Sequence, residues 1–295
     1  MLWVLFLVLA VAAASFLYPL LRKTYFTPAL VLANLALFLF LILLAVFSTD
    51  PGLSAFIRQN LLFKPEDLVD LRLWTLITSM FLHASVLHVI FNILFLYLLG
   101  LPLEDRIGGR AFAIIYLSTG LAASVLFAVV EWGNQVAALG ASGAIMGIAG
   151  AFLALYPRER IFFILVFLIL PRVRVYLAVG VVLLGEALLL VLQVQDGVAH
   201  AAHMGGIGFG ILLAPLIVRR KREAQAPLPL VALDDLATTE ELREILARIQ
   251  AENVGEVRDA WVDHFLEKAR CPQCQGPLTR RGKIVASTCG WERRL

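Results

Sequence analysis

The sequence has little charge for its length. Only 16% of its 295 residues are Asp, Glu, Lys or Arg, whereas 60% are hydrophobic. A typical soluble domain is about 25% charged and about 45–50% apolar. The formal net charge of +3 is also too small to indicate a nucleic-acid partner. These deficits indicate that most of the chain is neither an ordinary soluble domain nor a nucleic-acid-binding domain.

Cysteine is scarce and confined to one end. The chain has 3 cysteines, and Cys271, Cys274 and Cys289 all lie in its final segment. Since no cysteine lies among the hydrophobic residues before 218, no disulfide can staple the apolar region.

The hydrophobic residues form blocks of about 20, the length that a helix needs to cross the ~30 Å hydrocarbon core of a bilayer. A shorter apolar run at 160–170 is interpreted as a re-entrant or interfacial segment, or as the early part of the next helix. The loop 49–77 mixes apolar side chains with charges, so we expect it to lie in the membrane interface. We predict membrane helices at residues 2–20, 28–48, 78–99, 111–131, 141–157, 175–194 and 200–218.

The basic residues predict the orientation of these helices. Lys and Arg gather in alternate loops and after the last span, whereas the loops 132–140 and 195–199 contain none. Because basic loops stay in the cytoplasm, we expect an outer N-terminus and a cytoplasmic C-terminal tail, in a multi-pass protein of a prokaryotic plasma membrane. The first span carries Ala12-Ala13-Ala14, which is similar to a signal-peptide cleavage site. Its basic residues follow the apolar stretch, so we interpret it as an uncleaved helix.

Composition divides the chain into four parts. Residues 1–23 form an extra N-terminal membrane helix, and residues 24–222 form a six-helix membrane core. Residues 223–268 hold a linker at 224–230 and a soluble helix that begins at Thr238. Residues 269–295 form a small module. The expected fold class is therefore an all-α polytopic membrane protein with a small cytoplasmic C-terminal module.

Several polar side chains lie inside the apolar spans, where they are costly and therefore indicate function. Ser142 opens the fifth span and His203 lies near the start of the seventh, so both lie near the outer surface in the expected orientation. His88 and Asn92 in the third span are four residues apart and share a helix face. Glu186 in the sixth span has no evident role in the sequence.

Ser142, His203, His88 and Asn92 match the needs of acyl transfer by serine. A serine hydroxyl requires a base within hydrogen-bond reach, and a neutral His203 can take its proton and return it to the leaving amine. His88 and Asn92, with the backbone N–H of Ser142, can donate hydrogen bonds to the oxyanion. His200 is the nearest rival to His203 as the base.

Glycines adjoin the proposed reacting residues. Gly140 and Gly143 flank Ser142 and permit a tight turn and a close approach of substrate backbone. Gly143 with Gly147, and Gly206 with Gly210, form two small-xxx-small patterns, which let membrane helices approach closely. We therefore expect the fifth and seventh spans to pack together.

On these motifs the region 28–218 resembles the rhomboid family of intramembrane serine proteases. The residues around Ser142 are similar to the family's GxSG motif, and those around His203 to its AHxxGxxxG motif. Trp74-Thr75 departs from the Trp-Arg pair that the family often has in its first loop. His88 and Asn92 are similar to the family's HxxxN motif, and His83 to the histidine that precedes it. Glu104-Asp105-Arg106 is similar to the family's ExR element.

The resemblance implies Ser142 as nucleophile, His203 as general base, His88 and Asn92 in the oxyanion hole, and His83 in a supporting role. It implies no cofactor for catalysis. The implied substrates are single-pass membrane proteins in the lipid bilayer. The alternative is a non-catalytic rhomboid-like protein that binds transmembrane clients, but the presence of both serine and histidine favours the enzyme. A transporter with glycine-rich helices would predict an internal repeat, which is not evident.

The last module is similar to a degenerate zinc ribbon. Cys271 and Cys274 form a CxxC knuckle, and Cys289 is similar to part of a second knuckle. Ala286 stands where the fourth ligand of a structural zinc site is expected, and His264 could replace it. The alternatives to zinc are a folded, metal-free remnant and a set of reactive thiols.

Overall fold

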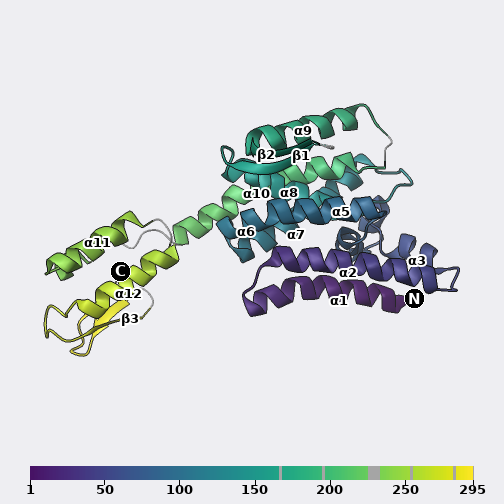
Figure 1. The fold of residues 1–295 in the computed structure, drawn as a ribbon. Coiled ribbons are helices and arrows are strands. Elements are labelled where there is room, and N and C mark those ends of the chain that lie inside the picture. Colours follow the sequence, from purple (N-terminus) through teal and green to yellow (C-terminus); the bar gives the residue numbers. More distant parts are fainter. Residues whose placement is uncertain (166–167, 195–196, 225–232, 253–254, 282–283, 295) are drawn as a thin grey trace. The chain divides into compact units, whose positions relative to one another are not determined.

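A computed structural model describes the chain except for residues 166–167, 195–196, 225–232, 253–254, 282–283 and 295 (Figure 1). It divides into two compact units, Met1–Arg219 and Arg220–Leu295. The predicted linker at 224–230 lies, apart from Ala224, outside the described residues.

The first unit is built from long apolar helices. Among the described residues, five helical stretches are long and apolar enough to cross a membrane, and two shorter apolar helices accompany them. The prediction of an all-α polytopic membrane fold is therefore confirmed. The long helices are α1 (Leu2–Arg22), α2 (Phe26–Phe47), α7 (Gly109–Val130), α10 (His200–Ala224) and the joined segments α5 (Val86–Phe95), η3 (Leu96–Gly100) and α6 (Leu101–Ile107); the shorter ones are α8 (Ser142–Leu155) and α9 (Val175–Val191).

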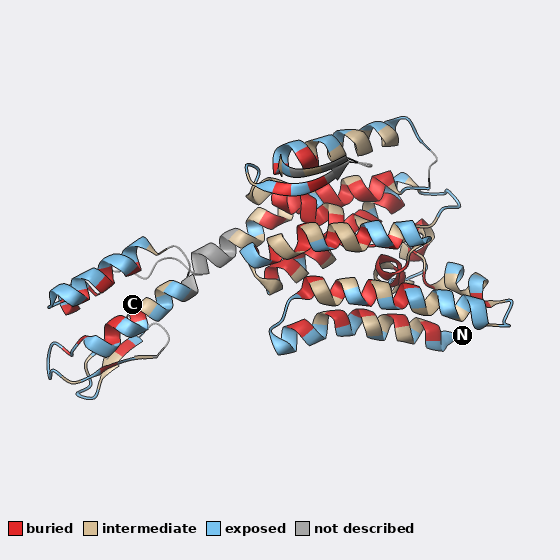
Figure 2. Ribbon diagram, in the orientation of Figure 1, coloured by how far each residue is buried: buried red, intermediate tan, exposed pale blue. Residues whose placement is uncertain are grey.

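The outer faces of these helices are apolar. Phe47, Leu21 and Leu184 are 78%, 76% and 72% exposed, and Figure 2 shows exposed positions along α1, α2 and α9. Scattered apolar residues are normal on a soluble protein, but continuous apolar faces of this kind are not. Lipid is the solvent that these faces require.

The centre of the unit is α8. Most of its residues are buried, and many of them are glycine or alanine. Its small side chains let α7 and α10 pack closely along it, and the α7–α8 contact is extensive. The helix that carries the proposed serine is thus held on several sides by other helices.

The third span begins later than the sequence predicted. The prediction placed its start at residue 78, but the helix starts at Val86, after Ser85, whose side-chain oxygen accepts a hydrogen bond from the His88 N–H at 3.2 Å. Such an N-cap satisfies a backbone donor that the helix itself cannot pair. The preceding residues form the short helices α4 (Thr75–Thr78) and η2 (Ser79–Phe81).

The loop 49–77 is folded. It contains α3 (Leu53–Asn60) and η1 (Pro65–Leu68), and it buries Leu61 and Phe63 completely. The Trp74 indole N–H donates to the Asn60 carbonyl at 2.9 Å. An ion pair joins Arg72 to Asp67 within the loop, and the hydroxyl of Thr78, which follows the loop, donates to the Leu61 carbonyl at 2.7 Å.

The apolar run at 160–170 is not the start of a helix. It forms β1 (Arg160–Leu165) and the beginning of β2 (Leu168–Arg174), which pair antiparallel with Arg160 opposite Arg174. The run is rich in β-branched and aromatic residues, which favour strands. Pro171 also disfavours a helical conformation before it, so α9 begins only at Val175. Figure 1 shows the hairpin beside α9, and the two are in contact.

The second unit has its own hydrophobic core. It comprises η5 (Asp234–Leu236), α11 (Glu240–Ala251), α12 (Gly255–Lys268) and a three-stranded antiparallel sheet in the order β3 (Leu278–Arg281), β4 (Ile284–Ser287), β5 (Glu292–Arg294). Side chains from both helices and the sheet meet in one cluster. The first helix begins one residue later than expected, because Thr239 rather than Thr238 is its N-cap and accepts a hydrogen bond from the Leu242 N–H at 3.3 Å.

Candidate active site

Ser142 is the first residue of α8, and backbone hydrogen bonds fix the position of the segment before it. Ala138 pairs with Phe63 through two backbone hydrogen bonds, and the Gly140 N–H donates to the Ser79 carbonyl at 2.8 Å. Gly140 has a φ of 111°, which side-chain-bearing residues rarely adopt. A Cβ there would also lie 2.7 Å from His88 Nε2. Glycine at 140 is therefore required for the turn that presents Ser142.

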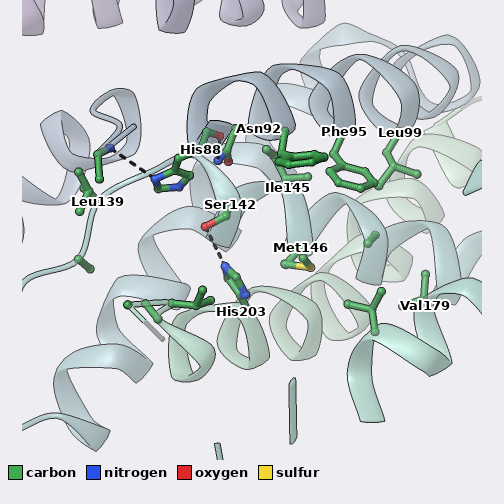
Figure 3. Close-up of a pocket in the computed structure, with 18 of the residues that line it drawn as sticks. His88, Asn92, Phe95, Leu99, Leu139, Ser142, Ile145, Met146, Val179 and His203 are labelled. Carbon is green, nitrogen blue, oxygen red and sulfur yellow. Dashed lines mark hydrogen bonds between the residues drawn. The ribbon is translucent and has the colours of Figure 1, made fainter. Parts of the chain in front are cut away.

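His203 reaches Ser142 from α10. Its Nε2 lies 2.9 Å from the Ser142 Oγ, within hydrogen-bond distance, as Figure 3 shows. The side chains are short, so the two backbones must be close. A Cβ on Gly206 would lie 2.1 Å from the Gly143 carbonyl oxygen, and one on Gly210 would lie 2.1 Å from that of Gly147. The two glycine patterns thus face each other directly.

His200 does not take the place of His203 beside the serine. Its Nδ1 lies 2.7 Å from Glu186 Oε2. The other oxygen of Glu186 lies 2.9 Å from His203 Nδ1. The sequence alone gives Glu186 no role, because its pairing with α10 depends on tertiary structure. The signal was nevertheless present: an acidic residue in one apolar span, and two histidines three residues apart at the start of the next.

His88 and Asn92 lie on the other side of Ser142 from His203 (Figure 3). The ideal Cβ position at Gly140 is 2.7 Å from His88 Nε2 and 3.8 Å from Ser142 Oγ, so the imidazole and the hydroxyl flank the same glycine. The Asn92 Nδ2 donates to the His88 carbonyl at 2.8 Å and retains a second N–H. The His83 ring packs edge-on against that of His88, with centroids 5.0 Å apart.

A cavity of about 630 Å³ opens over these side chains. His88, Asn92, Ser142 and His203 all line it, and most of the remaining lining is apolar. Figure 3 shows Phe95, Leu99, Met146 and Val179 along its length. It brings polar side chains of α5, α8 and α10 together at one wall of an apolar cavity.

The three cysteines gather in the second unit. Their sulfur atoms all lie within 4.8 Å of one another, and Cys271 Sγ is 3.7 Å from Cys289 Sγ. The Cys274 thiol contacts the Ser287 hydroxyl at 3.4 Å, and this hydrogen bond, followed by one with Cys289, lowers the pKa of Cys274 to about 6. The imidazole of His264 instead lies 3.5 Å from the Glu267 carboxylate, and among the described residues it is outside the cysteine group.

Comparison with known proteins gives a consistent family. Residues 70–220 match the Rhomboid domain. The chain is 31% identical over 164 residues to Rhomboid-type serine protease 2 of Emericella nidulans, covering 53% of this chain and 30% of that protein. It is 30% identical over 152 residues to Putative rhomboid protease YdcA of Bacillus subtilis, covering 50% and 69%. It is 29% identical over 154 residues to RHOMBOID-like protein 4 of Arabidopsis thaliana, covering 50% and 34%.

The chain thus spans about a third of the length of the fungal and plant relatives, 30% and 34%. The matched region nevertheless covers about half of this chain and contains all the residues that line the cavity around Ser142 from α5, α8 and α10. On that match, this chain, an integral membrane protein, belongs to the rhomboid family.

Proposed function

We propose that this chain is an intramembrane serine endopeptidase in which Ser142 is the nucleophile and His203 the general base. The observation that carries the proposal is the 2.9 Å contact between Ser142 Oγ and His203 Nε2 at the wall of an apolar cavity. The rhomboid family acts on transmembrane substrates within the membrane. A cavity that is apolar over most of its lining is suited to such a segment.

The reaction follows from the geometry. His203 Nε2 takes the hydroxyl proton while Ser142 Oγ attacks the scissile carbonyl carbon, and a tetrahedral intermediate forms. The imidazolium then protonates the departing amine nitrogen, the C–N bond breaks, and an acyl-enzyme remains. Water deprotonated by the same imidazole hydrolyses the ester and restores the serine. Nucleophile and base need no metal or cofactor for these steps.

The oxyanion of each intermediate requires donors. Ser142 begins α8, and the first N–H groups of a helix have no partner within that helix and carry a partial positive charge. The His88 ring and the Asn92 side chain lie opposite His203 across the serine. We propose that these three sources of N–H groups together form the oxyanion hole.

The substrates proposed are single-pass membrane proteins with helix-breaking residues near the cut, because a peptide bond in an intact helix is shielded from attack. The basic loops support an orientation in which the cavity opens toward the outer side of the membrane and the tail lies in the cytoplasm. A prokaryotic plasma membrane is the proposed location.

The test is cleavage of a single-pass model substrate in liposomes. Wild type is expected to cut within the transmembrane segment, and Ser142→Ala and His203→Asn are expected to be inactive. Ser124→Ala is the matched control, since Ser124 is a buried serine of α7 whose hydroxyl donates to the Gly120 carbonyl. A fluorophosphonate probe should label wild type and Ser124→Ala but not Ser142→Ala. Equal cleavage by wild type and Ser142→Ala would refute the mechanism, and client binding without cleavage by wild type would identify a non-catalytic rhomboid-like protein.

For the tail, we propose that Cys271, Cys274 and Cys289 bind zinc. Zn–S bonds of about 2.3 Å in a tetrahedral site place sulfur atoms about 3.8 Å apart, close to the 3.7 Å between Cys271 and Cys289. The thiolate is the ligand form, and the lowered pKa of Cys274 favours it. The fourth position would be filled by solvent, because Ala286 has no ligand atom.

Elemental analysis of purified full-length protein tests this site. Stoichiometric zinc is expected in wild type and in Ser124→Ala, with loss in Cys271→Ser and Cys289→Ser. The protein is purified without chelator and with added zinc. If wild type then carries no more zinc than Cys271→Ser, the module is metal-free.

A further inference from the structure

Glu186 carries an acidic group into an apolar helix and is bound there on both oxygens. Oε1 lies 2.9 Å from His203 Nδ1 and Oε2 lies 2.7 Å from His200 Nδ1. The side chains of Glu186, His203 and His200 are 14%, 10% and 5% exposed. An ionisable group at such a site is costly unless it is paired, so a carboxylate held by two imidazoles needs an explanation.

The contact determines which nitrogen of His203 carries the proton. An ionised carboxylate only accepts hydrogen bonds, so the Nδ1 of His203 must be the donor. In the neutral ring the Nε2 is then the unprotonated nitrogen, and it is the atom that lies 2.9 Å from the Ser142 hydroxyl. Glu186 therefore fixes the tautomer that is able to take the serine proton.

The carboxylate also faces the charge that develops during the reaction. When His203 accepts the serine proton, the ring becomes a cation 2.9 Å from Glu186 Oε1, and an opposite charge at that distance stabilises it. The other titratable groups near His203 are His200 on its own helix and His88 on α5. Neither of them supplies negative charge, so Glu186 alone has that effect among the groups named here.

The carboxylate comes from a different helix than the base. The buried residues of α9 are Val175, Ala178 and Val179, all near its start, and a Cβ on Gly180 or Gly185 would meet nothing within 4 Å. After Val179 the residues of α9 are half-buried or exposed, and Glu186 connects this part of the helix to α10. His200, one helical turn before His203, holds the second oxygen and fixes the direction of the first.

On the proposed function as its basis, we propose that Glu186 is a positioning residue that completes a Ser142–His203–Glu186 triad and that His200 anchors its carboxylate. Glu186 does not itself line the cavity; it contacts His203, which does. Its effect on catalysis passes through His203. The same three ligand atoms could instead hold a metal ion, since they lie within 4.8 Å of one another, and the experiment separates the two cases.

The test compares Glu186→Gln and Glu186→Asp with wild type by cleavage kinetics and by the rate of fluorophosphonate labelling at Ser142, each normalised to the folded fraction. Glutamine keeps the shape and loses the charge. We expect its kcat to fall at least about 10-fold, which is part of the roughly 10²–10⁴-fold that base catalysis contributes, with KM nearly unchanged. Aspartate keeps the charge and should recover several-fold of the lost kcat. His200→Asn should lose less than Glu186→Gln. Glu131→Gln, a half-buried acid at the end of α7, is the matched control and should behave as wild type.

Glu186→Gln with the kcat of wild type would overturn the proposal and leave the Ser142–His203 mechanism intact. A KM increase without a kcat decrease would also overturn it, because that result indicates a role in substrate binding. A metal ion that co-purifies with wild type and is lost in Glu186→Gln, together with inhibition of cleavage by a chelator, would replace the triad with a metal site. Failure of the proposed function itself is distinct, since Ser142→Ala would then cleave as well as wild type.

Discussion

Glu104 Oε2 accepts hydrogen bonds from both the backbone N–H and the hydroxyl of Thr27, at 2.9 Å and 2.8 Å. Its other oxygen accepts from the Phe26 N–H at 2.7 Å. Glu104 is 2% exposed and lies 77 residues from Thr27 along the chain. A carboxylate at the start of α2 satisfies donors that the helix cannot pair and complements its dipole. The residue thus acts as a helix cap supplied from another part of the sequence.

The first prediction concerns this cap. Glu104→Ala leaves buried N–H groups without an acceptor, and hydrogen bonds to charged groups are worth about 1.5–3 kcal/mol. We expect a clear fall in the thermal midpoint in detergent. Glu159→Gln is the control, because the Arg106–Glu159 ion pair is about one third exposed on each side, 35% and 37%, and such pairs contribute about 0–1 kcal/mol. Equal midpoints for Glu104→Ala and wild type would contradict the capping role.

The second prediction concerns the contact of α8 with α10. Gly206→Ala places a methyl group 2.1 Å from the Gly143 carbonyl oxygen, and since backbone cannot yield easily, the helices must separate. Overpacking of this kind typically costs about 1–3 kcal/mol. Because His203 is on the displaced helix, fluorophosphonate labelling of Ser142 should also be lost or greatly slowed. Gly208→Ala in the same helix meets nothing within 4 Å and should label normally; equal labelling of the two variants would show that the close approach is not needed.

The third prediction concerns the proposed oxyanion donors. Asn92→Ala removes an amide that lies beside the serine, and loss of one such donor typically lowers kcat about 10²–10³-fold. We expect a small change in KM, because the interaction forms mainly in the transition state. Asn134→Ala, in the loop after α7 and bonded to Glu131, provides the control. A loss confined to KM would assign Asn92 to substrate binding.

The fourth prediction concerns the independence of the tail. Phe265 and Cys271 are both fully buried in the core of the second unit. Phe265→Ala should cost about 3–5 kcal/mol and expose Cys271, which is then alkylated faster in zinc-free protein. Ser142 labelling should not change, because the first unit has a separate core. Val257→Ala, at an exposed position, is the control, and its Cys271 should be alkylated at the same rate as in wild type.

Much of the architecture follows from local patterns. Long apolar spans specify membrane helices because a bilayer leaves few alternatives, and the helix positions agree within a few residues except at the third span. There the short helices at 75–81 are also apolar, so hydropathy alone could not find the boundary, although Ser85 as a cap marks it. The hairpin at 160–174 was missed because a short apolar run fits several structures.

Four residues of the candidate site could be predicted from the sequence and Glu186 could not, for a physical reason. Ser142, His203, His88 and Asn92 belong to short motifs, and the sequence indicated that their helices meet. Glu186 stands among aliphatic residues with no motif around it, and its importance depends on which face of α9 turns toward α10. That rotation is fixed by packing rather than by periodicity, so only the structure brings the carboxylate to the imidazoles.

The glycine contacts have a consequence for how related sequences can diverge. A Cβ on Gly147 would collide with the Thr119 side chain at 2.0 Å, so a smaller residue at 119 could compensate for a larger one at 147. Gly206 and Gly210 meet carbonyl oxygens of the main chain, which no substitution in the neighbouring helix removes. Positions 119 and 147 should therefore covary among relatives, whereas 206 and 210 should have no covarying partner and change only when the two helices move apart.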